Sequence, residues 1–304
     1  MTAPVATPLT TPMAATAATP TAAGVPGAPA TAPAGDRRTW VEQVMGLPVS
    51  VTVRGPGARG VHPDRVVQAL FADLRRADAV FSTYRPDSEI SLVRRGVLPR
   101  QVVSPDVQEV LDLCDRARRL TGGFFDAELP DPGGRRLPDA DRADPGGRRL
   151  LDPSGLVKGW AVERAARRLD GLHGQDWLVD AGGDVLGRAT HGPAWQVAIE
   201  DPRDRDRLLV VLPLSAGAVA TSGTAARGRH LVDPRTGRPA PEHLLSASVV
   251  GPSLTWADVL ATAAFVEGPA ALSRISDLDG YEALLAHPDG RLAATRGLRN
   301  RLYR

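Results

Sequence analysis

Lysine is almost absent from this 304-residue chain, since Lys158 is the only lysine among its 37 lysines and arginines. A lysine ammonium is a compact point charge, whereas an arginine guanidinium is a flat fork of five donors, so the two suit different ligand contacts. Lys158 follows a turn of small residues that begins at Leu151 and opens onto a predicted helix. Two interpretations stay open at this point: Lys158 contacts a ligand, or the one remaining lysine lies here by chance.

Cysteine is equally scarce, because Cys114 is the only one in the chain. This excludes an intrachain disulfide and any zinc or iron–sulfur site built from cysteines. Cys114 lies in an apolar pattern of helical spacing from Val107 to Leu120, which predicts a buried structural thiol.

Several functional classes are excluded by missing patterns. No basic tract with interleaved aromatic residues is present, so no nucleic-acid partner is expected. No apolar run approaches the roughly 20 residues of a membrane helix, so no integral membrane segment is expected. The sequence also lacks the glycine-rich fingerprints of nucleotide-binding proteins. It contains neither a pair of metal-binding histidines on one helix nor the G-x-S-x-G nucleophile elbow.

The first 36 residues are almost entirely alanine, threonine, proline, glycine and valine, without charge before Asp36. Such a segment buries too little surface to offset its ordering entropy, which predicts a disordered tail over 1–36. It has no basic start, no unbroken apolar stretch and no cysteine for a lipid, so we expect a cytoplasmic protein. The remaining residues, 37–304, then form the functional domain.

Hydrophobic periodicity and cap residues predict a mixture of strands and helices in that domain. A helix is expected from Pro63 to Val80, and another begins at the Ser104-Pro105 cap and ends before Gly122. Further helices are predicted over 158–169, 256–266 and 270–275. A strand with a Gly-Gly turn is predicted over 177–186, and other strands over 49–53, 195–199, 208–212, 218–221, 245–250, 281–285 and 291–295. This mixture lacks regular βαβ alternation and therefore favours an α+β fold over a doubly wound sheet.

An identical heptapeptide occurs twice between these elements, at Asp131–Leu137 and at Asp144–Leu150. Two copies are too few for a solenoid, which needs three or more stacked units. The repeat predicts a surface loop or a paired hairpin.

Asp258 and Thr262 form the first candidate site, because residues four apart on a helix project from the same face. A carboxylate and a hydroxyl are hard donors that suit Mg²⁺ or Ca²⁺ rather than zinc. The alternative is an ordinary helix start, with an acidic residue near the positive end of the dipole and a threonine bonded back to the turn.

A second candidate is the loop Thr221-Ser-Gly223, followed by Arg227, Arg229 and His230. Its hydroxyls and backbone amides can cradle a phosphate, the arginines can neutralise it, and the histidine can move a proton near neutral pH. The alternative for the adjacent Asp233–Gly237 segment is a simple turn with solvated arginines.

Three glycine- or proline-bearing segments are weaker candidates. Asp180-Ala-Gly-Gly-Asp184 can let the backbone approach a ligand closely, or it is a hairpin turn. Thr121-Gly-Gly-Phe-Phe-Asp126 can place aromatic surface and a carboxylate beside a flat ring, or it is a glycine helix cap with two core phenylalanines. The loop Phe81–Ile90 gives little information about function by itself.

Taken in order, these segments resemble the FAD:protein FMN transferase (ApbE) family. The resemblance covers the chain from about Thr39 to its end, and the collinear order of the motifs is its most specific feature. The segments that carry it are Met45-Gly46, Ser82–Ile90, Thr121–Asp126, Asp152–Gly159, Ala181–Asp184, Thr221–Gly223, His230–Pro234, Thr236-Gly237 and Ala257–Thr262.

The resemblance implies a T-fold-like ApbE architecture and a Mg²⁺-dependent transferase. Such an enzyme transfers FMN from FAD, through a phosphoester bond, onto a threonine or serine of an acceptor flavoprotein and releases AMP. It implies that Asp258, Thr262 and the carbonyl of Gly155 bind Mg²⁺ and that His230 deprotonates or positions the acceptor hydroxyl. The residues that it places in the FAD site are Met45, Tyr84, Phe124, Phe125, Asp126, Asp152, Lys158 and Val232.

The chain departs from the family pattern between Asp126 and Asp152, which is shorter than expected and consists largely of the repeat. Ala127-Glu128 also replaces the small or hydroxylated residues that usually follow the phenylalanine–aspartate pair. Two other functions stay open: an FAD pyrophosphatase, in which water replaces the acceptor hydroxyl, and an FAD-binding or trafficking protein. The binding protein would need neither His230 nor a metal.

Overall fold

The computed structural model describes residues 36–130, 149–223 and 231–302. The predicted tail lies almost entirely outside them, so the tail and the domain boundary at residue 37 stay predictions. The helices are α1 Val61–Phe81, α2 Glu89–Arg94, η1 Arg100–Val102, α3 Pro105–Leu120, α4 Ser154–Ala166, η2 Arg167–Gly171, α5 Leu254–Glu267, α6 Ala271–Ser276 and α7 Arg296–Leu302. The strands are β1 Arg37–Val44, β2 Leu47–Arg54, β3 Glu128–Pro130, β4 Arg149–Leu151, β5 Asp176–Ala181, β6 Asp184–Arg188, β7 Trp195–Asp201, β8 Asp204–Leu214, β9 Ala216–Gly223, β10 Val232–Asp233, β11 Arg238–Pro239, β12 Ser246–Gly251, β13 Glu282–Ala286 and β14 Leu292–Ala294.

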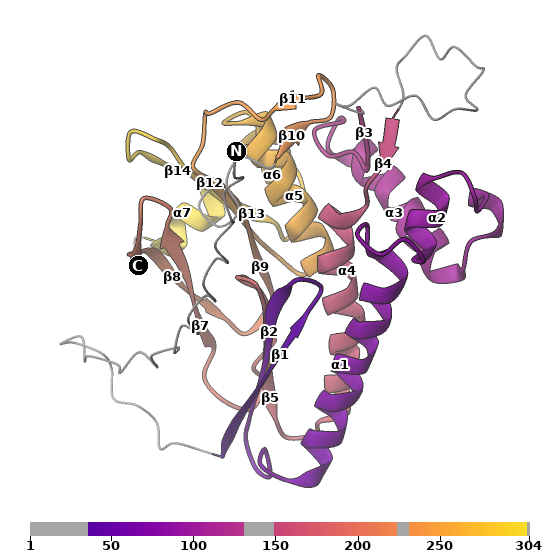
Figure 1. The fold of residues 1–304 in the computed structure, drawn as a ribbon. Coiled ribbons are helices and arrows are strands. Elements are labelled where there is room, and N and C mark those ends of the chain that lie inside the picture. Colours follow the sequence, from indigo (N-terminus) through magenta and orange to yellow (C-terminus); the bar gives the residue numbers. More distant parts are fainter. Residues whose placement is uncertain (1–35, 131–148, 224–230, 303–304) are drawn as a thin grey trace, which may run out of the picture. The chain divides into compact units, whose positions relative to one another are not determined.

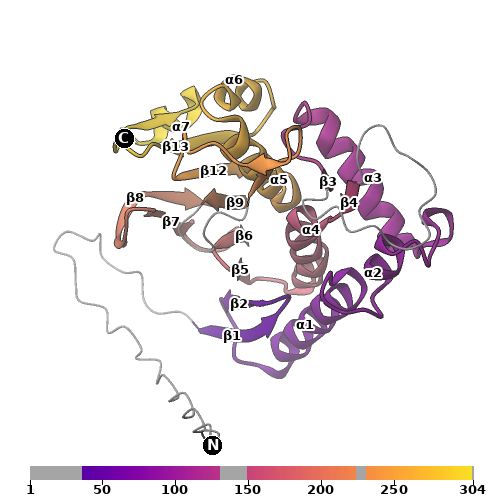
Figure 2. The same ribbon diagram turned by 45° about the horizontal axis from the view of Figure 1, so that its top comes forward.

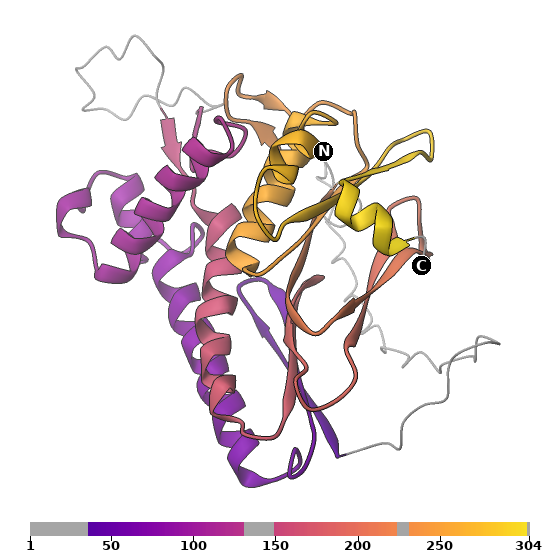
Figure 3. The same ribbon diagram turned by 180° about the vertical axis from the view of Figure 1, so that it is seen from behind.

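An eight-stranded antiparallel sheet in the order β1-β2-β5-β6-β9-β12-β13-β14 organises the domain (Figure 1). Helices α1, α4 and α5 line one face of this sheet, and their apolar side chains form the larger core with it (Figure 2). The β7–β8 hairpin and α7 pack a second, smaller core against the opposite face (Figure 3). The arrangement confirms the predicted α+β fold.

The local signals in the sequence explain most of these elements. Strand β2 turns Val49, Val51 and Val53 inward, and all three side chains are fully buried. Helix α3 begins where predicted, because the hydroxyl of Ser104 accepts a hydrogen bond from the Val107 N–H at 3.5 Å. Cys114 on α3 is buried, and burial raises the pKa of its thiol to about 12, so the predicted structural thiol is confirmed.

Several predictions about individual elements are wrong. The Thr221-Ser-Gly223 segment is not a loop, because it forms the end of β9, where Ser222 lies opposite Ala247 of β12. Strand β1 was not predicted, since exposed Val41 and two polar residues separate its buried Trp40 and Val44. Helix α4 begins at Ser154 rather than at Lys158. Its N-cap residue is Pro153, which provides no side-chain cap, and the Asp152 carboxylate just before it accepts from the Ser154 N–H at 3.1 Å in a local turn.

The heptapeptide repeat lies mostly outside the described residues. The chain on its two sides nevertheless pairs, since β3 and β4 form a short antiparallel ladder with Glu128 opposite Leu151. Across the described parts of the chain, none of the helices is both long and apolar enough to cross a lipid bilayer.

Candidate active site

The lone lysine contacts two buried carboxylates from different elements. Lys158 on α4 forms an ion pair with Asp184 at the start of β6, and its Nζ lies 3.5 Å from Asp258 Oδ1 on α5. The side chains of Asp184 and Asp258 are 2% and 4% exposed, whereas that of Lys158 is 23% exposed. The predicted ligand-contacting lysine and the predicted metal carboxylate are therefore neighbours in space.

Burial raises the pKa of Asp258 above its usual value. The positive charge of Lys158 and hydrogen bonds from Lys158 and the Gly159 backbone lower it, while the nearby Asp184 raises it further. One ammonium thus contacts two buried carboxylates. A divalent cation bound at Asp258 would favour the charged form of this carboxyl, which burial disfavours.

A close crossing of α4 and α5 brings these groups together. A Cβ atom on Gly159 would lie 3.0 Å from both the Leu254 carbonyl oxygen and the Thr255 Cα, and 3.3 Å from the Asp258 Cβ. A side chain at this position of α4 would therefore push α5 away. Glycine allows the turn that carries Lys158 to approach the turn that carries Asp258.

The donor set at this crossing fits Mg²⁺. Within the described residues, the Asp258 Oδ2 atom is buried without a hydrogen-bond partner. Thr262 lies one turn further along α5, with its Oγ1 3.0 Å from the Ser222 Oγ. The described parts of the chain contain no group of three or more histidines, cysteines or acids arranged for a metal. Mg²⁺ needs no such cage, since it is usually held by one or two carboxylates, waters and substrate phosphates.

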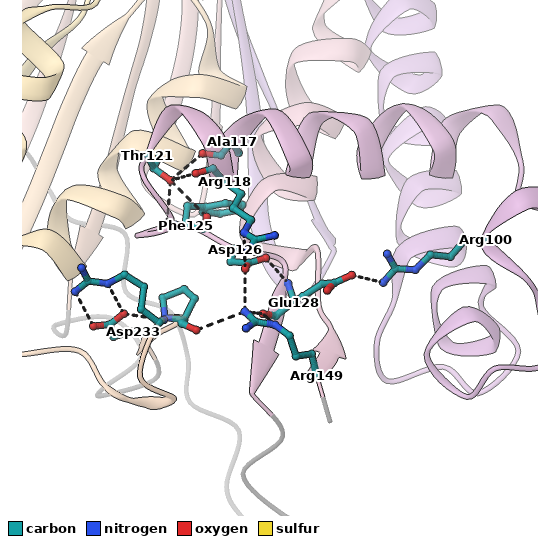
Figure 4. A network of polar contacts seen from close by, with 11 residues as sticks. Arg100, Ala117, Arg118, Thr121, Phe125, Asp126, Glu128, Arg149 and Asp233 are labelled. Carbon is teal, nitrogen blue, oxygen red and sulfur yellow. Dashed lines mark hydrogen bonds and ion pairs between the residues drawn. The ribbon is translucent and has the colours of Figure 1, made fainter. Parts of the chain in front are cut away.

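Asp126 is the centre of a second polar network, at the end of α3 (Figure 4). Its side chain is 8% exposed and forms ion pairs with Arg118 at 3.3 Å and with Arg149 at 2.9 Å. Its Oδ1 also accepts from the Glu128 N–H at 2.8 Å. These contacts hold β3, β4 and the end of α3 together.

A cavity of about 670 Å³ lies beside this network. Its lining contains four arginines and two aspartates, together with Gly122, Gly123 and Pro234; the charged residues are Asp115, Arg118, Arg119, Asp126, Arg149 and Arg235. The excess of guanidinium groups suits a ligand that carries phosphates.

Phe124 directly follows Gly123 of the cavity lining, and its ring packs against two cations. The guanidinium of Arg235 is 3.8 Å from the centroid of its ring, and that of Arg274 is 5.6 Å away. Arg235 is held by Asp233, which accepts from its Nε and its Nη2 at 3.0 Å each. The flat guanidinium of Arg235, which also lines the cavity, is therefore held against the ring.

Comparison with known proteins identifies the family. The model of the ApbE family matches residues 45–132 and 128–285. The chain belongs to the ApbE family. An FAD:protein FMN transferase of Haemophilus influenzae is 26% identical over 274 residues, covering 74% of this chain and 79% of that protein. A Treponema pallidum FAD:protein FMN transferase is 31% identical over 50% of this chain and 48% of its own length. These relatives confirm the prediction of a transferase.

Solved structures show the same fold. The ApbE protein of Thermotoga maritima has a TM-score of 0.73 at 22% identity, covering 88% of this chain and all of that one (100%). The flavin transferase ApbE of Vibrio cholerae has a TM-score of 0.71 at 24% identity, covering 87% of this chain and 99% of that one. The ApbE architecture predicted from the collinear motifs is confirmed.

The structure places the other residues that the ApbE resemblance assigned to FAD binding at turns and loops. Met45 occupies the β1–β2 turn with Gly46, at positive φ angles of 57° and 74° that suit a tight hairpin. Tyr84 is 96% exposed, and Val232 pairs with Pro239 in the short β10–β11 hairpin. Asp152 bonds to the start of α4. Their contacts with FAD stay predictions.

The structure confirms the glycine cap at Thr121–Asp126, but only one of the two phenylalanines lies in the core. Gly122 and Gly123 follow α3 at positive φ, and the Gly123 N–H donates to the Arg118 carbonyl at 2.9 Å. Phe125 is 4% exposed and lies in the core, whereas Phe124 is only partly buried. Phe124 is therefore better placed than Phe125 to meet a ligand.

The predicted roles of His230, its neighbouring arginines and the Gly155 carbonyl also lack a direct structural test. His230 and the flanking Arg227 and Arg229 lie outside the described residues. Gly155 lies in the first turn of α4, where its Cβ position faces the Phe125 ring at 3.2 Å. The role of its carbonyl as a metal ligand stays a prediction.

Asp184 is the site residue that sequence reasoning missed. The Gly182-Gly183 turn before it was noted only for its glycines, although an acid that directly follows such a turn is well placed to enter a site. Its Oδ1 accepts from the Thr221 N–H at 3.0 Å, which fixes the carboxylate against β9 and directs it toward Lys158.

Proposed function

We propose that this ApbE-family transferase is a Mg²⁺-dependent FAD:protein FMN transferase. It attaches FMN from FAD through a phosphoester bond to a threonine or serine of an acceptor flavoprotein and releases AMP. The observation that carries the proposal is the contact of Lys158 with buried Asp258, one helical turn from Thr262. The activity of the matched relatives from Haemophilus influenzae and Treponema pallidum supports it.

In this proposal Asp258, Thr262 and the Gly155 carbonyl hold the metal ion. When bound, Mg²⁺ neutralises charge on the pyrophosphate and acts as a Lewis acid. Lys158 supports the same end, because its ammonium lies 3.5 Å from Asp258 Oδ1 and can donate to a phosphate oxygen near the metal ligands. Asp184 keeps the ammonium in place through its ion pair.

The transfer forms one bond and breaks one. The acceptor hydroxyl oxygen attacks the phosphorus on the FMN side, the bond from that phosphorus to the bridging oxygen breaks, and AMP leaves with the bridging oxygen. His230 accepts or directs the proton of the hydroxyl. The products are the acceptor with FMN in a phosphoester bond and AMP.

The cavity beside Phe124 supports binding of a dinucleotide. Its arginines provide donors for the two phosphates of FAD, and the Phe124–Arg235 stack provides a flat surface for a ring. We place FAD along a path that also includes Met45, Tyr84, Phe125, Asp126, Asp152, Lys158 and Val232.

One assay tests the proposal. The protein is incubated with FAD, MgCl₂ and a candidate acceptor flavoprotein, and AMP release and acceptor-bound flavin fluorescence on a denaturing gel are followed. A fluorescent acceptor together with AMP supports transfer, whereas free FMN with AMP indicates an FAD pyrophosphatase. Unchanged FAD contradicts both enzymes. An Asp258→Ala variant should show no turnover, and full activity in that variant would refute the metal assignment.

A further inference from the structure

Glu163 on α4 accepts three hydrogen bonds from the start of α5. Its Oε2 accepts from the Ser253 hydroxyl at 2.8 Å, from the Thr255 N–H at 2.9 Å and from the Thr255 hydroxyl at 2.7 Å. Ser253 is also the N-cap of α5, since its hydroxyl accepts from the Trp256 N–H at 3.4 Å. One carboxylate oxygen thus holds the first turn of the helix that carries Asp258 and Thr262.

Glu163 and Gly159 act on the same helix crossing. They are four residues apart and therefore project from the same face of α4. Gly159 lets α5 come close, as its hypothetical Cβ contacts at 3.0 Å show, and Glu163 bonds to α5 at that short separation. A carboxylate at the N-terminal end of a helix is also favoured by the helix dipole.

The crossing sets the position of Asp258 relative to Lys158. Asp258 lies three residues after Thr255 on α5, and Lys158 lies directly before Gly159 on α4. Because both helices are rigid over a single turn, the hydrogen bonds to Glu163 fix where the Asp258 carboxylate meets the ammonium. We propose that Glu163 is a positioning residue that holds the metal-binding turn of α5 in register with Lys158.

The chain supplies its own reporter for this geometry, because Lys158 is its only lysine. The rate at which an N-hydroxysuccinimide ester acylates Lys158, read by mass spectrometry of its peptide, measures how firmly the ammonium is held by the two carboxylates. The α-amino group is the only other amine, and it lies on a different peptide. This measurement needs neither FAD nor a metal.

Glu163→Leu is the test variant and Glu109→Leu is its matched control. Glu109 also bonds α4 to a neighbouring helix, accepting from Trp160 Nε1 at 3.1 Å and from Arg164 Nη1 at 2.7 Å, but it lies on α3. Both variants should lower the melting temperature. Only Glu163→Leu should speed the acylation of Lys158. Only this variant should also weaken Mg²⁺ binding, measured as a higher MgCl₂ concentration at the midpoint of the Mg²⁺-dependent rise in melting temperature.

The effect on turnover rests on the proposed function. We expect Glu163→Leu to lower kcat about 10- to 100-fold, because a misplacement of about 1 Å at a reacting centre can reduce the rate about 100-fold. Glu163→Gln, which keeps an oxygen acceptor, should rescue most of kcat and of the Lys158 protection. An inactive wild-type protein would refute the proposed function and leave the acylation and melting measurements to decide the role of Glu163.

Acylation of Lys158 at the wild-type rate in folded Glu163→Leu would overturn the inference. So would a Glu163→Gln variant as impaired as Glu163→Leu, since that result would assign the effect to charge rather than to the hydrogen bonds. If Glu163→Leu does not fold, Thr255→Val removes one of the three donors and decides the question by the same acylation measurement.

Discussion

The Gly159→Ala variant tests whether the stability of this protein follows the helix propensity of α4 or the packing of α4 against α5. Alanine in a helix interior is about 1 kcal/mol more favourable than glycine, so the sequence of α4 taken alone predicts a more stable protein. The structure predicts the opposite, because the new Cβ would lie 3.0 Å from two backbone atoms of α5. Backbone atoms cannot rotate away as a flexible side chain can, so the helices must separate.

The gain in helix propensity and the cost of the clash with α5 can be compared in magnitude. Adding a methyl group to a well-packed core costs about 1–3 kcal/mol, which exceeds the gain in helix propensity over most of that range. A net loss of about 1 kcal/mol would lower the melting temperature by roughly 2–4 °C for a domain of about this size. Because the clash lies 3.3 Å from the Asp258 Cβ, turnover should fall by tenfold or more, on the order of the effect of small misplacements at reacting centres.

Scanning calorimetry and the FAD-dependent transfer assay measure these effects. Gly171→Ala is the control, since no atom lies within 4 Å of the Cβ position there. We expect the control to keep full turnover and an unchanged or slightly raised melting temperature. A Gly159→Ala protein that is more stable than the wild type and fully active would refute the argument that a tight crossing builds the site.

Three further predictions concern charges. Lys158→Arg should weaken FAD-dependent turnover while the protein stays folded, because a planar guanidinium does not fit between Asp184 and Asp258 as an ammonium does; unchanged kinetics would contradict a specific role for the lysine. Asp258→Asn should abolish the Mg²⁺-dependent rise in melting temperature yet keep or raise the metal-free value, because burial already raises the pKa of this carboxyl and so disfavours its charge; a large loss of metal-free stability would contradict that reasoning. Burial raises the pKa of Asp176, but hydrogen bonds from the His191 and Thr190 N–H groups and from Arg54 outweigh burial and lower it overall. A lowered folded-state pKa gives stability that is present above the unfolded value of about 3.9 and is lost as the pH falls through the folded value. Urea unfolding between about pH 5 and pH 2 should therefore show a gap between wild type and Asp176→Asn that closes as the solution becomes more acidic; a constant gap would contradict this assignment.

Local patterns in the sequence were enough to predict most of the main helices and the central strands. The apolar spacing of Val67, Leu70, Phe71 and Leu74 predicts α1, and these four side chains are buried. The same kind of information predicts that Asp258 and Thr262 share a helix face. Such predictions succeed because the period of a helix or strand is set by the backbone of the residues themselves.

The edge strand β1 and the start of α4 could not be predicted in this way. β1 is stabilised by its ladder with β2, from Arg37 opposite Arg54 to Val44 opposite Leu47, and not by a strong apolar pattern of its own. Helix α4 starts at the small residues Ser154 and Gly155, next to a hydrogen bond from the Ser154 N–H to the Asp152 carboxylate, and apolar periodicity detects neither feature.

By itself, the sequence determined the kinds of group available at the site: a single lysine, an acid and a hydroxyl one helical turn apart, and a glycine-rich turn that ends in Asp184. Only the tertiary structure decided that Lys158 meets Asp184 and Asp258, and that Gly159 and Glu163 set this meeting. These residues come from α4, β6 and α5, which are distant in the sequence. Their separation is fixed by the packing of two helices on a sheet, and no local pattern encodes that packing.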